Sequence, residues 1–94
     1  MKYISRKGVI LCEIADQNVL IAAKHLRKDV PYVTSLNETG AFCWKQLEEG
    51  IDEKELCQRM KQEYDVDQQD NISEDVHSLI QQLLERNSIQ VMEI

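Results

Sequence analysis

Apolar residues in the first third of the chain form short, β-branched runs separated by polar residues. Residues 9–15 (V-I-L-C-E-I-A) and residues 19–23 are two such runs, and the turn-forming residues 16–18 lie between them. This pattern is typical of a β-hairpin. A third run, residues 32–36, follows Pro31, which has no N–H to donate and therefore suits the start of a strand or a sheet edge. The pattern predicts three strands.

From Asn37 onwards, apolar residues recur every three or four positions, which indicates helices. Asn37 suits the N-cap of a first helix, and Gly50 is placed to end that helix in the left-handed conformation. Asp52 and Glu55 have the spacing of a capping box, which predicts the start of a second helix. The apolar stripe of this second helix consists of Leu56, Cys57, Met60 and Tyr64.

A third helix is expected to begin near residues 71–73, after an acidic connection at residues 65–70, and to end near Arg86 and Asn87. Its apolar residues cover a wide arc: Ile72, Val76, Leu79, Ile80, Leu83 and Leu84. One line of this arc is Val76, Ile80 and Leu84. Leu79 and Leu83 are displaced around the helix from that line, so one line can face the core and the other a partner. Ile89, Val91 and Ile94 alternate with polar residues, which indicates a short terminal strand or an ordered tail.

Three strands followed by three helices predict a single α+β domain over residues 1–94. The expected architecture is winged-helix-like, with a three-stranded antiparallel sheet followed by three helices. Apolar residues make up 43% of the chain and charged residues 30%, a balance typical of globular proteins. No apolar run approaches the roughly 20 residues that span a bilayer, and residues 1–6 lack the apolar core of a signal peptide. We therefore expect a cytoplasmic protein.

The residue types that carry metal or catalytic chemistry are few and scattered. The cysteines Cys12, Cys43 and Cys57 are widely separated, and His25 and His77 are isolated, so we expect free thiols, no metal and no cofactor. No G-x-S-x-G motif and no glycine-rich phosphate loop are present, which argues against an enzyme. A pairing of Cys43 with His77 stays open at this stage.

The charge balance argues against nucleic-acid binding. The chain has 11 basic and 17 acidic residues, for a net charge of −6, whereas affinity for nucleic acid depends on Lys and Arg side chains that neutralise phosphates. From Tyr64 to the end of the chain the only basic residue is Arg86. Phosphate groups would repel the third helix, which is the element that a DNA-binding winged helix places in the major groove.

The stretch from Leu36 to Trp44 resembles the L-N-E-T-G-A-x-x-W signature of PqqD-like proteins, which are also called RiPP recognition elements. The resemblance covers about residues 8–90. Its downstream parts are residues 47–50, 55–56, 63–67, 75–76 and Leu83. The chain departs from the common pattern at Asn87-Ser88, where many relatives carry a glycine or a hydrophobic residue, and in the unusually basic loop at residues 24–30.

The resemblance implies a function in peptide recognition. Proteins of this kind bind the leader segment of a ribosomally made precursor peptide as a strand added against the third strand, and the third helix closes the cleft. They present the leader to a separate or fused modifying enzyme. That enzyme is often a radical SAM protein, and sometimes a leader protease or a cyclase.

The candidate binding residues follow from this layout. No Lys, Glu or Asp lies in residues 32–36, so the usual charged guard of a sheet edge is missing there. Strand alternation places Tyr32 and Thr34 on one face and Val33 and Ser35 on the other. The full set of expected peptide contacts is Tyr32, Val33, Thr34, Ser35, Leu36, Asp75, Leu79 and Leu83.

Several of these assignments have plain structural alternatives. Leu79 and Leu83 could instead complete the core, and Asp75 could be only a helix N-terminal charge. The basic residues Lys24, Arg27 and Lys28 are either a solvated loop or an attractor for acidic leader residues. A regulatory or structural interaction module with the same fold also fits the sequence, and an unguarded edge could pair with a second copy to form a homodimer.

Overall fold

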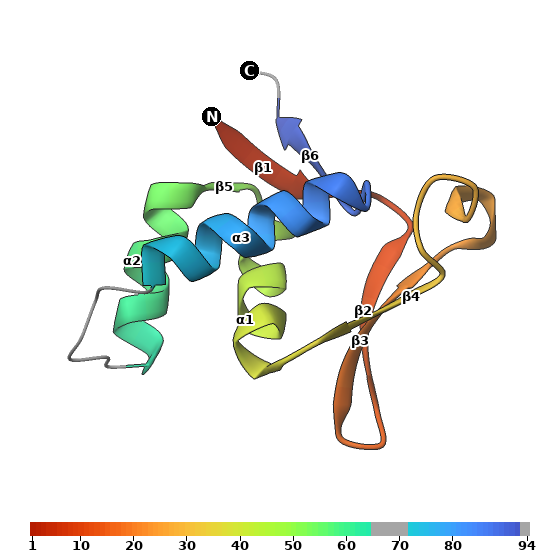
Figure 1. The fold of residues 1–94 in the computed structure, drawn as a ribbon, viewed down its shortest axis with the longest axis horizontal. Helices are drawn as coiled ribbons and strands as arrows, with labels where there is room; N and C mark the ends of the chain where they lie inside the picture. The colour runs from red at the N-terminus through yellow and green to blue at the C-terminus, as the bar shows by residue number, and fades with distance from the viewer. Residues whose placement is uncertain (65–71, 93–94) are drawn as a thin grey trace.

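Two small antiparallel sheets and three α-helices make up the computed structural model, which describes residues 1–64 and 72–92 (Figure 1). The strands are β1 (Lys2–Ser5), β2 (Val9–Ile14), β3 (Gln17–Ala22), β4 (Val33–Leu36), β5 (Ile51–Asp52) and β6 (Ile89–Met92). The helices are α1 (Glu38–Leu47), α2 (Glu53–Tyr64), α3 (Ile72–Glu85) and a short 3-10 helix, η1 (Lys24–Leu26). The α+β class is as predicted. The acidic connection, Asn71 and Ile94 lie outside the described residues.

The predicted hairpin and third strand form one sheet, in the order β2-β3-β4. All its pairs are antiparallel. The turn of the hairpin differs from the prediction, since it consists of Ala15 and Asp16 rather than residues 16–18. Both residues have positive φ, at 50° and 65°. Two such residues give a two-residue turn whose twist matches that of the flanking strands.

A second sheet, in the order β5-β1-β6, adds to the predicted architecture. The terminal strand β6 was expected, but β1 and β5 were not. β5 has only two residues, and β1 has four residues without a clear alternation of apolar and polar side chains. Such short segments are stabilised by their neighbours in the sheet, so their own pattern does not reveal them.

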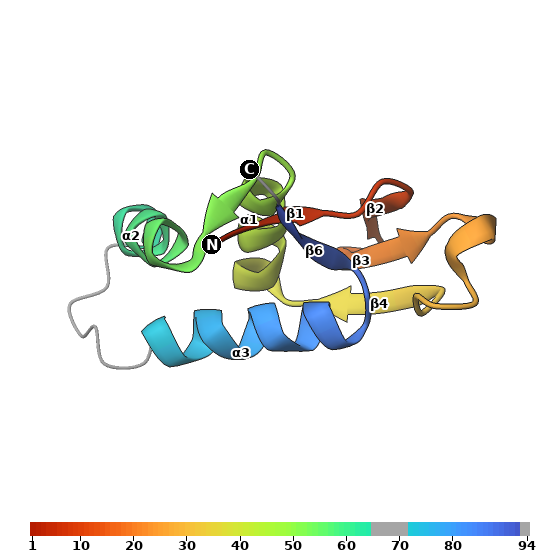
Figure 2. The same ribbon diagram turned by 90° about the horizontal axis from the view of Figure 1, so that it is seen from above.

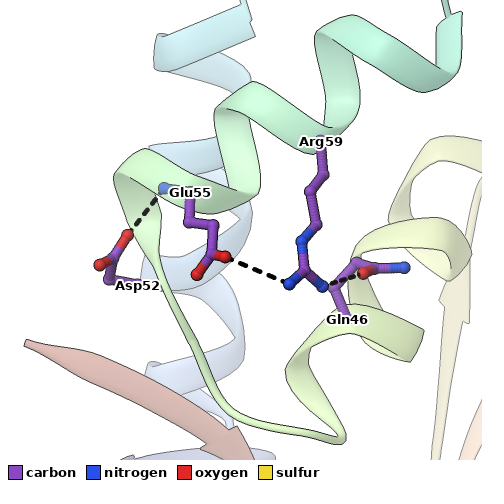
Figure 3. A network of polar contacts seen from close by, with 4 residues as sticks. All are labelled: Gln46, Asp52, Glu55 and Arg59. Atoms are coloured by element: carbon purple, nitrogen blue, oxygen red, sulfur yellow. Dashed lines mark hydrogen bonds and ion pairs between the residues drawn. The ribbon is translucent and has the colours of Figure 1, made fainter.

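The helix starts are as predicted. The Asn37 side chain accepts a hydrogen bond from the N–H of Gly40 at 2.7 Å, and Asp52 Oδ1 accepts one from the N–H of Glu55 at 2.7 Å. The carboxylate of Glu55 pairs with Arg59 at 3.2 Å, and Arg59 also donates to Gln46 Oε1 at 2.6 Å. Figure 3 shows that this network joins α1 to α2.

The core lies between the helices and both sheets: it includes one face of the β2-β3-β4 sheet and Ile51 and Ile89 of the other sheet, and Trp44 is fully buried in it. The predicted line on α3 was Val76, Ile80 and Leu84. The stripe that α3 buries has Ile72 in addition and Leu83 in place of Leu84. Leu84 is only partly buried. A line of residues four apart drifts around a helix of 3.6 residues per turn, so the side that faces the core passes from Ile80 to Leu83.

α3 ends in a left-handed residue that is not glycine. Asn87 has a φ of 57°, its N–H donates to the Leu84 carbonyl at 3.0 Å, and the N–H of Ser88 donates to the Leu83 carbonyl at 2.9 Å. This is a Schellman motif, and asparagine is one of the few side chains that adopt its left-handed position readily. The Asn87 side chain also donates to the Asp29 carbonyl at 2.9 Å, which ties the end of α3 to the loop before β4.

Candidate functional site

Strand β4 forms one edge of its sheet. It pairs with β3 on one side, and within residues 1–64 and 72–92 no strand pairs with it on the other. Figure 2 shows α3 on the side of β4 that faces away from β3. An edge strand with unpaired N–H and C=O groups is a template for an added strand. The geometry therefore agrees with the expectation of an uncovered edge beside the third helix.

The pairing register decides which backbone groups of β4 are unpaired. The N–H of Ala22 donates to the Tyr32 carbonyl at 2.9 Å, and the next opposite pairs are Ile21 with Val33 and Leu20 with Thr34. Hydrogen-bonded and non-bonded pairs alternate along an antiparallel ladder. The backbone N–H and C=O groups of Thr34 and Leu36 therefore form hydrogen bonds with β3. The N–H and C=O groups of Val33 and Ser35 point to the unpaired side.

The side chains of the predicted strand divide unevenly between its two faces. Thr34 is buried against the core, whereas Val33 is 51% exposed and Ser35 is also exposed. Leu36 is half-buried beside the core. Tyr32 precedes the strand, and its ring lies 3.6 Å from the Arg27 guanidinium carbon. The Thr34 side chain therefore packs in the core and cannot contact a ligand, whereas the side chains of Val33 and Ser35 are exposed and can.

A cleft of about 330 Å³ lies between the start of α1 and the exposed side of α3, next to the end of β4. Its lining is a mixture of polar and apolar residues: Asn37, Thr39, Gly40, Cys43, Met60, Asp75, Val76, Ser78, Leu79 and Gln82. Two of the three predicted α3 residues, Asp75 and Leu79, are on this wall. Leu83 is not, because it is fully buried in the core.

The polar part of this lining was missed in the sequence. Ser78 and Gln82 lie four residues apart on α3 and line the cleft together with Leu79. They are polar and next to an apolar stripe, so helical periodicity alone assigns them to solvent. Asn37 was identified only as a helix cap, and it lines the cleft as well.

The basic loop residues Lys24, Arg27 and Lys28 are all exposed and precede β4. Arg27 is held in place, because its Nε donates to the Ala22 carbonyl at 3.2 Å while its guanidinium covers the Tyr32 ring. The structure gives no such contact for the two lysines. The loop thus places positive charge near the start of the edge strand, whereas Glu38 and Asp75 place negative charge near its end.

The two groups considered for catalysis have different surroundings: Cys43 is buried, whereas His77 is exposed and lies against Glu53. Burial raises the pKa of the Cys43 thiol to about 12, with a smaller effect of Cys57, so Cys43 is protonated at neutral pH. A protonated thiol is a weak nucleophile. His77 Nδ1 lies 3.1 Å from Glu53 Oε1. In the part of the chain that the structure describes, no three His, Cys, Asp or Glu side chains are grouped to hold a metal ion.

None of the helices in residues 1–64 and 72–92 combines the length and the apolar composition needed to cross a bilayer.

Comparisons with known proteins place the fold. One solved structure, described as TbiB1 in complex with the TbiA(beta) leader peptide, is 21% identical, with a TM-score of 0.72; the match covers 97% of this chain and 99% of that one. Another, described as lasso peptide synthetase B1 complexed with the leader peptide, is 20% identical, with a TM-score of 0.69 and coverage of 96% and 98%. At these identities the likeness shows a common fold.

A search of curated proteins gave no match. The family model described as Coenzyme PQQ synthesis protein D (PqqD) matches residues 19–89, which is more than half of the chain. The protein therefore belongs to the PqqD family.

Proposed function

We propose that this protein binds the leader segment of a ribosomally made precursor peptide by strand addition to β4 and presents it to a modifying enzyme. The observation that carries the proposal is the edge of β4, where the N–H and C=O groups of Val33 and Ser35 have no partner strand in the described residues. Both similar solved structures are described as complexes with leader peptides.

The register sorts the side chains of the bound leader into two sets. Leader residues that pair with Val33 and Ser35 share their face of the sheet, because residues directly opposite each other point to the same side. The leader residues between them point to the other side, towards Thr34, Leu36 and the cleft lined by Leu79. Backbone pairing supplies affinity for many sequences, and the cleft supplies selectivity.

The charges around the edge favour a leader with acidic residues at one end of the bound segment and basic residues at the other. Acidic leader residues are favoured near Lys24 and Lys28, and basic ones near Glu38 and Asp75 at the other end of β4. We count Tyr32 as a border contact, since its ring is half exposed and covered on one side by Arg27. Thr34 contributes packing, and Leu83 supports the wall from within the core.

The sheet has a second edge, β2, and two features favour β4. First, the cleft adjoins β4. Second, β4 carries no charged side chain, whereas β2 carries Glu13, and a charge on an edge discourages pairing. The Ala23 N–H bonds to the Gly8 carbonyl and the ladder alternates from there, so the N–H groups of Leu11 and Glu13 point to the outer side of β2. The N–H of Val9 points away from β3 as well, but it donates to the Arg6 carbonyl at 3.2 Å.

The modifying enzyme is a separate or fused partner such as a radical SAM protein, and the chain itself acts as a carrier rather than a catalyst. The buried, protonated Cys43 supports this assignment. Acidic side chains in the first turn of α3, with no basic residue in its last turn, argue against a nucleic-acid partner. The site of action is the bacterial cytoplasm, where ribosomal precursors are made. A homodimer through β4 would compete with the leader for the same edge.

The proposal is tested by titrating the ¹⁵N-labelled protein with leader peptides encoded beside its gene. The amide signals of residues 32–36 and those of α3 near Leu79 are expected to shift together. Val33→Pro removes an outward N–H and keeps the β3-β4 ladder, so it should lower leader affinity at least tenfold while the protein stays folded.

Glu13→Pro is the matched control. It also removes an outward N–H, but from the β2 edge, and should leave leader affinity within about twofold. If Val33→Pro binds as tightly as the parent chain, strand addition at β4 is wrong. If only Glu13→Pro weakens binding, the leader pairs with β2.

A further inference from the structure

Six of the 11 basic residues lie together at one end of the molecule, called the basic end below. They come from three separate segments: the turn at residues 6–8, the loop at residues 23–29 and the end of α3 at residues 85–87. The six are Arg6, Lys7, Lys24, Arg27, Lys28 and Arg86. The same three segments contain two acidic residues, Asp29 and Glu85, although the whole chain has 17.

Hydrogen bonds hold the three segments against one another. The Ala23 N–H donates to the Gly8 carbonyl at 2.7 Å, which joins the loop to the turn. Arg6 Nη1 donates to the Asn87 carbonyl at 3.4 Å, and Asn87 Nδ2 donates to the Asp29 carbonyl at 2.9 Å. Figures 1 and 2 show the turn, η1 and the end of α3 on the same side of the molecule as the start of β4. The six basic residues therefore surround one end of the edge strand.

Ion pairs within the described residues do not neutralise the basic end. Those pairs are Arg59 with Glu55 and His77 with Glu53, and they lie on α2 and α3 away from the six residues. Five of the six side chains are exposed, and Arg6 is half-exposed. Like charges that lie close together repel one another, so a ligand that brings several carboxylates is attracted to this end.

The position of the basic end beside β4 selects the ligand. The Arg27 guanidinium carbon lies 3.6 Å from the centre of the Tyr32 ring, directly before the edge strand. Its Nε donates to the Ala22 carbonyl at 3.2 Å, and its two Nη groups suit a carboxylate. Each extended residue adds about 3.3 Å, so a peptide that pairs with Val33 and continues past Tyr32 crosses the basic end within about four residues.

We infer that the basic end binds an acidic stretch of the leader, namely several Asp or Glu residues in the part of the peptide that leaves β4 at Tyr32. The inference rests on the proposed function and deepens it by naming the class of leader. Single exposed ion pairs are weak, so a stretch of carboxylates is needed rather than one. The turn and the end of α3 thereby join the site through Arg6, Lys7 and Arg86.

Four synthetic peptides test the inference on the full chain. Each contains the strand-forming segment of the encoded leader, with a run of three Glu or three Gln at one end or the other. One placement puts the run beside the basic end, and the other puts it beside Glu38 and Asp75. At low salt, the Glu run beside the basic end should bind at least tenfold more tightly than the Gln run. The other Glu run should bind more weakly than its Gln counterpart.

Salt and substitutions locate the contact. The advantage of the Glu run should fall below threefold in about 0.5 M NaCl, because ions screen exposed charges. A triple variant with Lys24→Gln, Lys28→Gln and Arg86→Gln should lose most of the advantage and bind the Gln peptides within twofold of the parent chain. The matched control replaces three exposed lysines of other segments, with Lys2→Gln, Lys45→Gln and Lys54→Gln. It removes the same charge and should keep the advantage.

The outcomes separate this inference from the proposed function. Equal affinity of the Glu and Gln peptides at low salt would overturn the inference and leave strand addition in place. So would a Glu advantage that survives in the first triple variant and disappears in the control. Tighter binding of a short DNA duplex than of the Glu peptide at the same salt would assign the basic end to phosphate instead. Absence of binding by all four peptides would refute the proposed function itself.

Discussion

The side-chain amide of Asn87 donates a hydrogen bond to the backbone carbonyl of Asp29 at 2.9 Å, across 58 residues of sequence. Asn87 closes α3, and Asp29 lies in the loop that leads into β4. The bond therefore fixes the position of α3 relative to the start of the edge strand. Asn87, at which the chain departs from the common family pattern, thus sets the position of α3 beside the edge of β4 to which we propose that the leader binds.

Two substitutions of Asn87 separate its two roles. Asn87→Gly keeps the left-handed conformation and loses the bond to Asp29, so stability should change little and leader affinity should fall several-fold. Asn87→Ala loses both and should also lower the free energy of unfolding by about 1–2 kcal/mol. Urea denaturation and leader titration measure the two effects. Parent-like affinity of Asn87→Gly would show that the bond does not shape the groove.

Leu79 and Leu83 should respond differently to truncation. Leu83 is fully buried, so Leu83→Ala should lower the free energy of unfolding by about 2–5 kcal/mol. Leu79 is half-buried on the wall of the cleft, so Leu79→Ala should cost about 1 kcal/mol or less and weaken leader binding. Chemical denaturation and calorimetric titration of both variants check this. A large stability loss in Leu79→Ala with normal binding would assign Leu79 to the core instead.

The Cys43 thiol should make stability depend on alkaline pH. Its pKa is about 12 in the folded protein, against 9.0 for an unperturbed cysteine, and desolvation is the main cause. The folded state therefore retains the proton that the unfolded state loses above pH 9. Stability should be unaffected by this group well below pH 9 and fall as pH rises through 9 towards 12, by roughly 1.4 kcal/mol at pH 10.

Cys43→Ala provides the control for that pH dependence. The variant is less stable at neutral pH, because it leaves a small cavity, but its stability should decline less between pH 8 and pH 10 than that of the parent chain. The measurement is urea denaturation at a series of pH values. Equal declines in the two chains would mean that Cys43 does not contribute.

Local patterns were sufficient to predict the elements that have their own sequence signals. The caps at Asn37 and Asp52, the hairpin and the unguarded strand predicted at residues 32–36, which the structure has at Val33–Leu36, all follow from side chains that act on their immediate neighbours. The contacts that depend on distant neighbours did not follow. β5 is defined by its pairing with β1. The hairpin turn was missed because it places Ala15 at positive φ, a conformation that alanine seldom adopts.

The site shows the same division. The apolar residue Leu79 was predicted at the cleft, whereas Ser78 and Gln82 were assigned to solvent because polar residues on a helix usually face it. Leu83 was placed on the wrong side of α3, since the sequence does not fix how a wide apolar arc is rotated against the core. Which backbone groups of β4 point outward depends on register, which the Ala22–Tyr32 hydrogen bond sets.

Hydrogen exchange along β4 tests strand addition most directly. In the protein alone, the amides of Thr34 and Leu36 should exchange slowly and those of Val33 and Ser35 quickly, because only the former bond to β3. With saturating leader peptide, exchange at Val33 and Ser35 should slow at least tenfold. Unchanged exchange at these two amides, while the leader is bound elsewhere on the protein, would contradict the account.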